Sequence, residues 1–151
     1  AGVDEGTTLR LTGRGAVGPR GGPAGDLYVR VRVRPHPVFE RHGPDLLHRL
    51  EVPMTQAALG VVLDYETLDG TEELHIPRGT RTGEVFRFRG RGVPHLEGRG
   101  RGDLVIEVVV ATPDDLTDEA ERLLRELADE RDEVVTEPDE GLISRFRSAF
   151  K

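Results

Sequence analysis

The chain has 151 residues, of which 36% are hydrophobic and 32% charged, with 19 Gly, 10 Pro and no Cys. Such a length is typical of one ordinary domain or two very small ones, and no apolar run is long enough to predict a membrane span. The lack of Cys excludes disulfides, zinc–thiolate sites and thiol catalysis within these residues, and it fits a reducing, cytoplasmic location.

The net charge of −7 is unevenly distributed along the chain. Residues 1–112 carry 15 Arg against 15 Asp and Glu, whereas residues 113–151 carry 6 Arg and Lys against 13 Asp and Glu. A protein that binds the phosphate backbone needs a basic surplus on some surface. The charge balance therefore argues against nucleic-acid binding, although clusters of Arg and Gly keep that interpretation open.

Residues 1–34 predict two strands joined by a long loop. Residues 7–12 alternate polar and apolar side chains and end at a glycine, as strands often do. Residues 13–25 are rich in Gly and Pro, which predicts the loop. In residues 27–34, Leu and Val alternate with Tyr and Arg, which predicts a half-buried strand with a charged outer face.

Residues 35–44 are punctuated by Pro and Gly and predict a connector, and residues 45–112 predict a second β-rich unit. Within this unit, Asp69-Gly70 is a strong hairpin signal, and residues 55–60 predict a single helical turn. The strands expected here are residues 45–52, 61–68, 72–76, 84–89 and 104–111.

Residues 113–131 predict a C-terminal helix that packs on the second unit. From Leu116 onwards the apolar residues recur at helical spacing, and Thr117 can cap the helix N-terminus. The i,i+4 ion pairs expected on its solvent-facing side are Asp118–Arg122, Glu121–Arg125 and Arg122–Glu126.

Residues 132–151 predict an acidic linker followed by a short apolar segment. Four large apolar side chains of this segment form one helical stripe, at Leu142, Ile143, Phe146 and Phe150. A helix this short is not stable alone in water, so the stripe needs a surface on which to pack.

The chain also contains an internal repeat with an offset of 77 residues. Residues 2–15 and 79–92 both read Gly, three residues, Gly, a short alternating strand and Gly-Arg-Gly, and residues 25–27 match 102–104 as Gly-Asp-Leu. We therefore predict two copies of one β-rich unit. Because further strands precede only the second copy, we expect the first unit to be truncated and the chain to be a fragment of a longer protein.

Some short motifs resemble functional signatures but lack the required context. Residues 13–18 read Gly-x-Gly-x-x-Gly, yet Pro19 and the glycines that follow exclude a helix N-terminus for a pyrophosphate. Residues 42–45 read His-Gly-Pro-Asp, which a turn before a strand explains. The five His show no ligand spacing and no nucleophile motif is present, so we expect neither a metal site nor an enzyme.

Arg-Gly tracts at residues 89–92 and 98–102 support the alternative function, a nucleic-acid-binding β-module. Modules of that kind combine basic residues with aromatic side chains on which bases stack, and these tracts have no interleaved aromatics. We interpret the tracts as β-turns in which Arg provides solubility, and nucleic acid is an unexpected partner.

A set of sequence blocks is characteristic when taken together. They are Gly-Asp-Leu-Tyr-Val at 25–29, His-Pro-Val-Phe-Glu-Arg at 36–41, and residues 45–46, 55–60, 68–70, 76–80, 89–94, 101–104 and 145–150. With these blocks, essentially the whole chain resembles the C-terminal region of the DnaJ family, the J-domain co-chaperones of the 70-kDa heat-shock ATPase.

The resemblance implies a mostly-β fold of two tandem small β-sandwich-like units, followed by a helix and a short dimerisation segment. It implies a homodimeric co-chaperone that binds unfolded polypeptides for delivery to the 70-kDa heat-shock ATPase and catalyses no reaction. These residues contain neither the J-domain nor the Cys-rich zinc repeat of some subfamilies. We therefore expect no cofactor here, with zinc possible upstream in the full-length protein.

The resemblance also implies site residues. In the family, the client pocket includes the Phe of the His-Pro-x-Phe block, which is Phe39, and the neighbours that we expect are Val38, Leu9 and Leu11. Plain core packing is the alternative for Phe39.

A dimerisation role is implied for the apolar stripe Leu142, Ile143, Phe146 and Phe150. The alternative for this stripe is docking on the preceding helix over residues 120–128.

Overall fold

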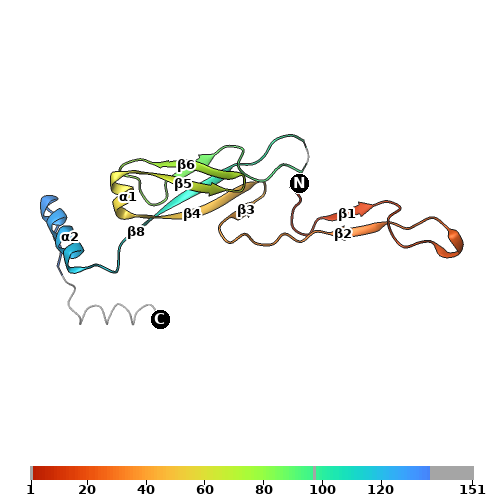
Figure 1. The fold of residues 1–151 in the computed structure, drawn as a ribbon, viewed down its shortest axis with the longest axis horizontal. Coiled ribbons are helices and arrows are strands. Elements are labelled where there is room, and N and C mark those ends of the chain that lie inside the picture. Colours follow the sequence, from red (N-terminus) through yellow and green to blue (C-terminus); the bar gives the residue numbers. More distant parts are fainter. Residues whose placement is uncertain (1, 97, 137–151) are drawn as a thin grey trace. The chain divides into compact units, whose positions relative to one another are not determined.

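The computed structural model describes residues 2–96 and 98–136. The chain divides into two compact units, Ala1–Thr112 and Pro113–Lys151. The first unit contains every strand of the described chain, arranged in three sheets (Figure 1). The predicted mostly-β fold with a C-terminal helix is confirmed.

The first sheet is a two-stranded antiparallel hairpin of β1 (Thr8–Leu11) and β2 (Leu27–Arg30). Its long Gly- and Pro-rich loop contains one short 3-10 helix, Pro19–Gly21. The prediction of a half-buried strand over residues 27–34 is wrong in two respects, since β2 ends at Arg30 and all four of its residues are exposed. Alternation marks the apolar face correctly, but in the described chain no second layer covers it.

The other strands form a two-layer sandwich. One layer is a four-stranded sheet in the order β3 (Glu40–His42), β4 (Asp45–Pro53), β8 (Leu104–Ala111) and β7 (Val85–Phe88). In this sheet β4 and β8 run parallel, and the other neighbours run antiparallel. The second layer is the hairpin of β5 (Val61–Thr67) and β6 (Gly70–Ile76). The predicted hairpin at Asp69-Gly70 is confirmed, with Leu68 and Asp69 as its turn residues.

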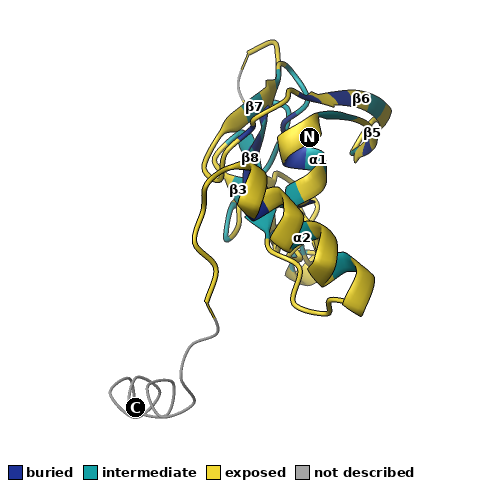
Figure 2. Cartoon of the chain, turned by 90° about the vertical axis from the view of Figure 1, so that its left-hand side faces the viewer, coloured by how far each residue is buried: buried dark blue, intermediate teal, exposed yellow. Residues whose placement is uncertain are grey.

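The core lies between these two layers. Because side chains alternate along a strand, every second residue of β4 and β8 faces the β5–β6 hairpin. The buried residues on β6 and β8 are visible in Figure 2. The largest fully buried side chains are Val52, Leu104, Ile106 and Val108.

A short helix, α1 (Met54–Leu59), links β4 to β5, as predicted for residues 55–60. Its buried Ala57 accepts hydrogen bonds through its carbonyl from the amides of Gly79 and Thr80, at 2.9 and 3.1 Å. These bonds join α1 to the turn that follows β6.

Strand β3 lies inside residues 35–44, for which only a connector is predicted. It pairs with the start of β4 through a two-residue turn at Gly43 and Pro44, with His42 opposite Asp45. Gly43 has a φ of 61°, which glycine adopts at little cost. The interpretation of His-Gly-Pro-Asp as a turn before a strand is therefore confirmed.

The internal repeat appears in the strand register. In the first hairpin, Leu9 lies opposite Val29. Seventy-seven residues later, Phe86 of β7 lies opposite Ile106 of β8. All four residue pairs of β1–β2 recur at this offset in β7–β8, so the predicted repeat is confirmed in these strands.

Loop contacts repeat as well. The amide of Gly15 donates to the carbonyl of Gly25 at 2.7 Å, and the amide of Gly92 donates to the carbonyl of Gly102 at 2.8 Å. Glycine is required at position 92 because a Cβ there would lie 2.5 Å from the carbonyl carbon of Gly102. The Gly-Arg-Gly segments therefore bring two backbone segments together.

The second unit contains the helix α2 (Asp118–Glu130). The hydroxyl of Thr117 accepts a hydrogen bond from the amide of Ala120 at 3.2 Å, which confirms the predicted cap. The predicted Glu121–Arg125 and Arg122–Glu126 ion pairs are present. In place of the predicted pair with Asp118, Arg122 forms an ion pair with Glu119. Packing of this helix on the sandwich stays a prediction. No helix in the described residues is long and apolar enough to cross a membrane.

Candidate functional site

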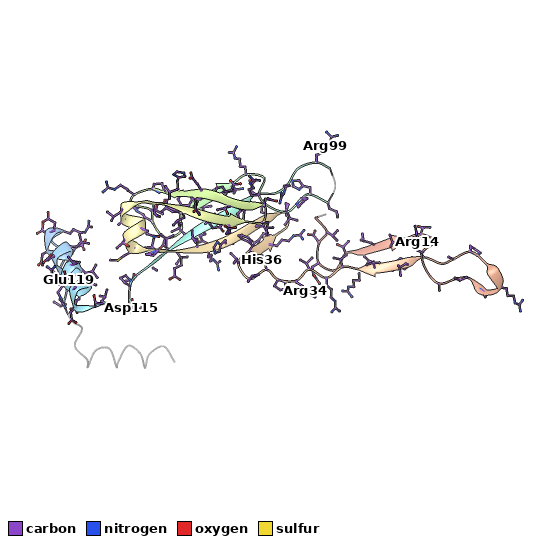
Figure 3. All side chains as sticks on the ribbon, in the orientation of Figure 1. Arg14, Arg34, His36, Arg99, Asp115 and Glu119 are labelled. Atoms are coloured by element: carbon purple, nitrogen blue, oxygen red, sulfur yellow. The ribbon has the colours of Figure 1, made fainter. Side chains whose placement is uncertain are left out.

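The connector between β2 and β3 places Phe39 against two histidine rings. His36, which Figure 3 labels on this connector, stacks on Phe39 with ring centroids 4.9 Å apart and an interplanar angle of 21°. His48 of β4 meets the ring of Phe39 edge-on, with centroids 6.0 Å apart. Phe39 is only 7% exposed and belongs to the hydrophobic core of the sandwich.

His36 also holds the backbone of this segment. Its Nδ1 atom accepts hydrogen bonds from the amides of Val38 and Phe39, each at 3.2 Å. Pro35 and Pro37 flank the histidine, and a residue before a proline favours an extended backbone. The chain therefore turns after Pro37, which leaves Phe39 buried while Val38 is 47% exposed.

The other side of the aromatic cluster is closed by Tyr65 of β5. Its hydroxyl is hydrogen-bonded to His48 Nδ1 at 2.6 Å, and its ring contacts Phe88. Burial lowers the pKa of His48 and raises the pKa of Tyr65 to about 12. Both side chains are therefore uncharged at neutral pH.

Two cavities share the walls formed by His36, Val38 and Phe39. The larger, of about 890 Å³, extends towards Val33, Leu46 and Val93. The smaller, of about 320 Å³, is lined on its far side by His48, Tyr65 and Leu68. The structure thus combines an exposed apolar side chain, Val38, with two adjacent hollows, as a site for apolar side chains requires.

Leu9 and Leu11 lie elsewhere in the same compact unit. They are 42% and 44% exposed and share one face of the β1–β2 hairpin with Leu27 and Val29. They are not among the described residues that line either cavity. The structure therefore brings Val38 and Phe39 together, and it places the two leucines on a separate exposed apolar surface.

The four residues of the predicted dimerisation stripe, Leu142, Ile143, Phe146 and Phe150, lie outside the described residues. Their role stays a prediction.

Sequence reasoning missed His36, His48 and Tyr65 as parts of this cluster. Neither the ligand spacing of the five His nor the turn motif at residues 42–45 points to such a cluster, and the described residues hold no group of three His, Asp or Glu that could bind a metal. The one available signal was the spacing of His36 from Phe39, which lets a side-chain acceptor reach a backbone amide two or three residues further on.

The Arg-Gly tracts take part in structural ion pairs. Arg101 binds Asp69 at 2.8 Å, and Arg91 binds Glu72, so both arginines tie the loop after β7 to the β5–β6 hairpin. The hydrogen bond from Arg101 is the main cause that lowers the pKa of Asp69. These contacts favour the interpretation of the tracts as turns over that of a nucleic-acid surface.

Comparison with known proteins gives one consistent result. Residues 1–113 match the DnaJ C terminal domain. Proteins named Chaperone protein DnaJ 2 from Streptomyces avermitilis and Streptomyces coelicolor are 51% and 52% identical over 155 residues, which cover 99% of this chain and 41% of each relative. Chaperone protein DnaJ from Ruminiclostridium cellulolyticum is 44% identical over 151 residues, with 100% of this chain and 40% of the relative covered. The chain spans about two fifths of the length of these relatives.

Proposed function

The chain belongs to the DnaJ family, and from this membership we propose that it is the part of a co-chaperone that binds unfolded polypeptide clients. The proposed activity is binding without covalent chemistry. It involves no cofactor within these residues, and we place it in the cytoplasm.

The observation that carries the proposal is the half-exposed Val38 beside two adjacent cavities, and the apolar face of the β1–β2 hairpin is a second candidate surface. Leu9 and Leu11 are exposed there, whereas Phe86 and Phe88, at the equivalent positions of the repeat, pack against the core. Apolar surface in contact with water costs about 25 cal/mol per Å². An unfolded chain, which has exposed apolar side chains of its own, lowers the free energy by covering this face.

The backbone of the hairpin offers a second kind of contact. Within the described chain β2 pairs only with β1, whereas β8, its equivalent, pairs with both β4 and β7. A strand edge with unpaired amide and carbonyl groups accepts an extended segment as an additional strand. An unfolded client supplies such segments together with apolar side chains.

Val38 and Phe39 supply the contact beside the two cavities. Val38 is half exposed and lines both cavities, so a client side chain that enters either of them touches it. Phe39 forms the wall between the cavities and belongs to the core at the same time. We therefore assign direct contact to Val38 and a supporting role to Phe39.

The proposal includes a homodimer formed through Leu142, Ile143, Phe146 and Phe150. Each large apolar side chain contributes roughly 1.5–3 kcal/mol when it is fully buried, before the costs of ordering are subtracted. A dimer presents two client sites, and linked weak sites gain avidity. Delivery of clients to the 70-kDa heat-shock chaperone is proposed for the full-length protein.

The test is whether the purified chain suppresses aggregation of a chemically denatured protein, and whether added salt changes this effect. Client binding through apolar contacts persists at high salt, whereas binding to nucleic acid falls steeply. If the chain suppresses no aggregation but binds single-stranded RNA in a salt-sensitive manner, the proposal is wrong and the nucleic-acid alternative is favoured.

A further inference from the structure

His36 fixes Phe39 in two ways at once. Its ring stacks on the ring of Phe39, and its Nδ1 atom accepts the amide hydrogens of both Val38 and Phe39. No other residue makes both kinds of contact with Phe39 in the described chain. The position of the wall between the two cavities therefore depends on this side chain.

The two amide bonds require an unprotonated Nδ1 atom. A neutral histidine with its proton on Nε2 has a free electron pair on Nδ1, whereas a protonated histidine is a donor at both nitrogens. After protonation, the Nδ1 hydrogen would point at two amide hydrogens. His36 is exposed, so solvent protons reach it directly.

Charged groups of both signs line the larger cavity together with His36. Around the larger cavity, the carboxylates belong to Asp4, Glu5 and Glu40, and the guanidinium groups to Arg34 and Arg41. Asp4 forms an ion pair with Arg41, which reduces the effect of both charges on the histidine.

Around the smaller cavity, the facing titratable groups are His48, Tyr65 and Glu66. His48 and Tyr65 are uncharged partners in one hydrogen bond. The acceptor role of His36 Nδ1 is therefore the feature that protonation of this side chain removes.

We propose that His36 is a positioning residue of the client site, which holds Val38 and Phe39 in the binding arrangement while it is neutral and releases them when it is protonated. This inference rests on the proposed function. It predicts that client affinity falls on acidification, and that the fall requires an imidazole at position 36.

The experiment uses the full 151-residue chain and a labelled, uncharged peptide rich in Leu, Val and Phe as the client. Binding is measured at about pH 7.5 and about pH 5.5, on either side of the ordinary titration range of histidine. The variants are His36→Asn, whose side-chain oxygen replaces Nδ1 as an acceptor that does not titrate, and His36→Ala, which removes the acceptor. His75→Asn, at an exposed position on β6, is the matched control.

We expect wild type and His75→Asn to lose affinity about three- to tenfold at the lower pH, the effect of one or two ordinary hydrogen bonds. His36→Asn binds at both pH values as tightly as wild type binds at about pH 7.5, and His36→Ala is weak at both. Amide hydrogen exchange at Val38 and Phe39, measured by NMR without peptide, is faster in His36→Ala than in wild type or His36→Asn.

The outcomes separate the two claims. If wild type binds no peptide at about pH 7.5, the proposed function fails, and the positioning role fails with it. If wild type binds but His36→Ala binds equally well, or if His36→Asn retains the wild-type pH dependence, only the positioning role is overturned. Equal exchange at Val38 and Phe39 in wild type and His36→Ala also overturns it.

Discussion

Gly90 donates its amide hydrogen to Oδ1 of Asp103 at 2.8 Å. The equivalent residues of the first repeat make the same bond, since Gly13 donates to Oδ1 of Asp26 at 3.0 Å. In both copies the second carboxylate oxygen binds an arginine, Arg87 or Arg10. The Gly-Asp-Leu blocks thus hold equivalent turns in the two copies.

This bond predicts a pH-dependent contribution to stability. In the folded chain, the hydrogen bond from the Gly90 amide is the largest cause that lowers the pKa of Asp103 below its ordinary value of 3.8, and the hydrogen bond from Arg87 is the second. The stabilisation is therefore present above the unfolded-state pKa and is lost as the pH falls through the lower, folded-state pKa. Asp103→Asn should lower the melting temperature at neutral pH and approach wild type in acid.

Thermal unfolding followed by circular dichroism at several pH values checks this expectation. Asp64→Asn, at an exposed position on β5, is the control and should melt like wild type. A deficit of Asp103→Asn that stays equal at neutral and acid pH would show that the carboxylate charge is not the cause.

A second prediction compares one hydrogen bond in the two copies. The amide of Val31 donates to the backbone carbonyl of Thr7 at 2.8 Å, and the amide of its equivalent, Val108, donates to the backbone carbonyl of Glu84 at 2.9 Å. Strand β8 lies between two strands, whereas the exposed hairpin has only one strand pair. Val31 should therefore exchange its amide hydrogen much faster than Val108 does. Equal protection of the two amides in a monomer would contradict this.

A third prediction concerns core packing at equivalent positions. Ile106 is fully buried, so Ile106→Ala should reduce the free energy of unfolding by about 2–5 kcal/mol. Val29, its equivalent on β2, is exposed, so Val29→Ala should cost less than about 1 kcal/mol. Urea denaturation measures both, and similar losses would mean that the hairpin is packed as tightly as the sandwich.

Some features of this structure could be predicted from residue patterns alone. Strand β8 spans the predicted residues 104–111, because apolar and mostly β-branched residues cover nearly the whole strand and its inner face is fully apolar. The hairpin and helix signals at Asp69-Gly70 and Thr117 are local, and both are confirmed. Patterns of this kind depend only on neighbours along the chain.

Other features depend on partners that are distant in sequence. Strand β3 has only three residues and no periodicity, and it forms because β4 offers a pairing edge. The alternation in β2 marks the correct apolar face, but burial requires a second layer that alternation cannot reveal. The role of His36 depends on the turn that returns the chain to its Nδ1 atom, which no spacing rule for metal ligands detects.

A fourth prediction concerns the proposed dimer. Deletion of residues 141–151 removes Leu142, Ile143, Phe146 and Phe150 and should convert a dimer to a monomer in sedimentation equilibrium. The thermal unfolding of the sandwich should be unchanged, because none of its strands is removed. A binding free energy of roughly 8 kcal/mol would keep the chain dimeric at tens of micromolar. If the undeleted 151-residue chain is already monomeric at that concentration, this role is excluded.

The most direct test of the central claim measures binding of an unfolded, apolar peptide to surface variants. Leu9→Ser and Val38→Ser each remove one exposed apolar side chain from the proposed site, and Val62→Ser removes one from β5 as the control. We expect the first two to weaken binding by about tenfold or more, as loss of a central contact residue does, with unchanged circular dichroism. Val62→Ser should bind like wild type. If all three variants bind as wild type does, clients do not bind at the hairpin face or beside Phe39, and the proposed site is wrong.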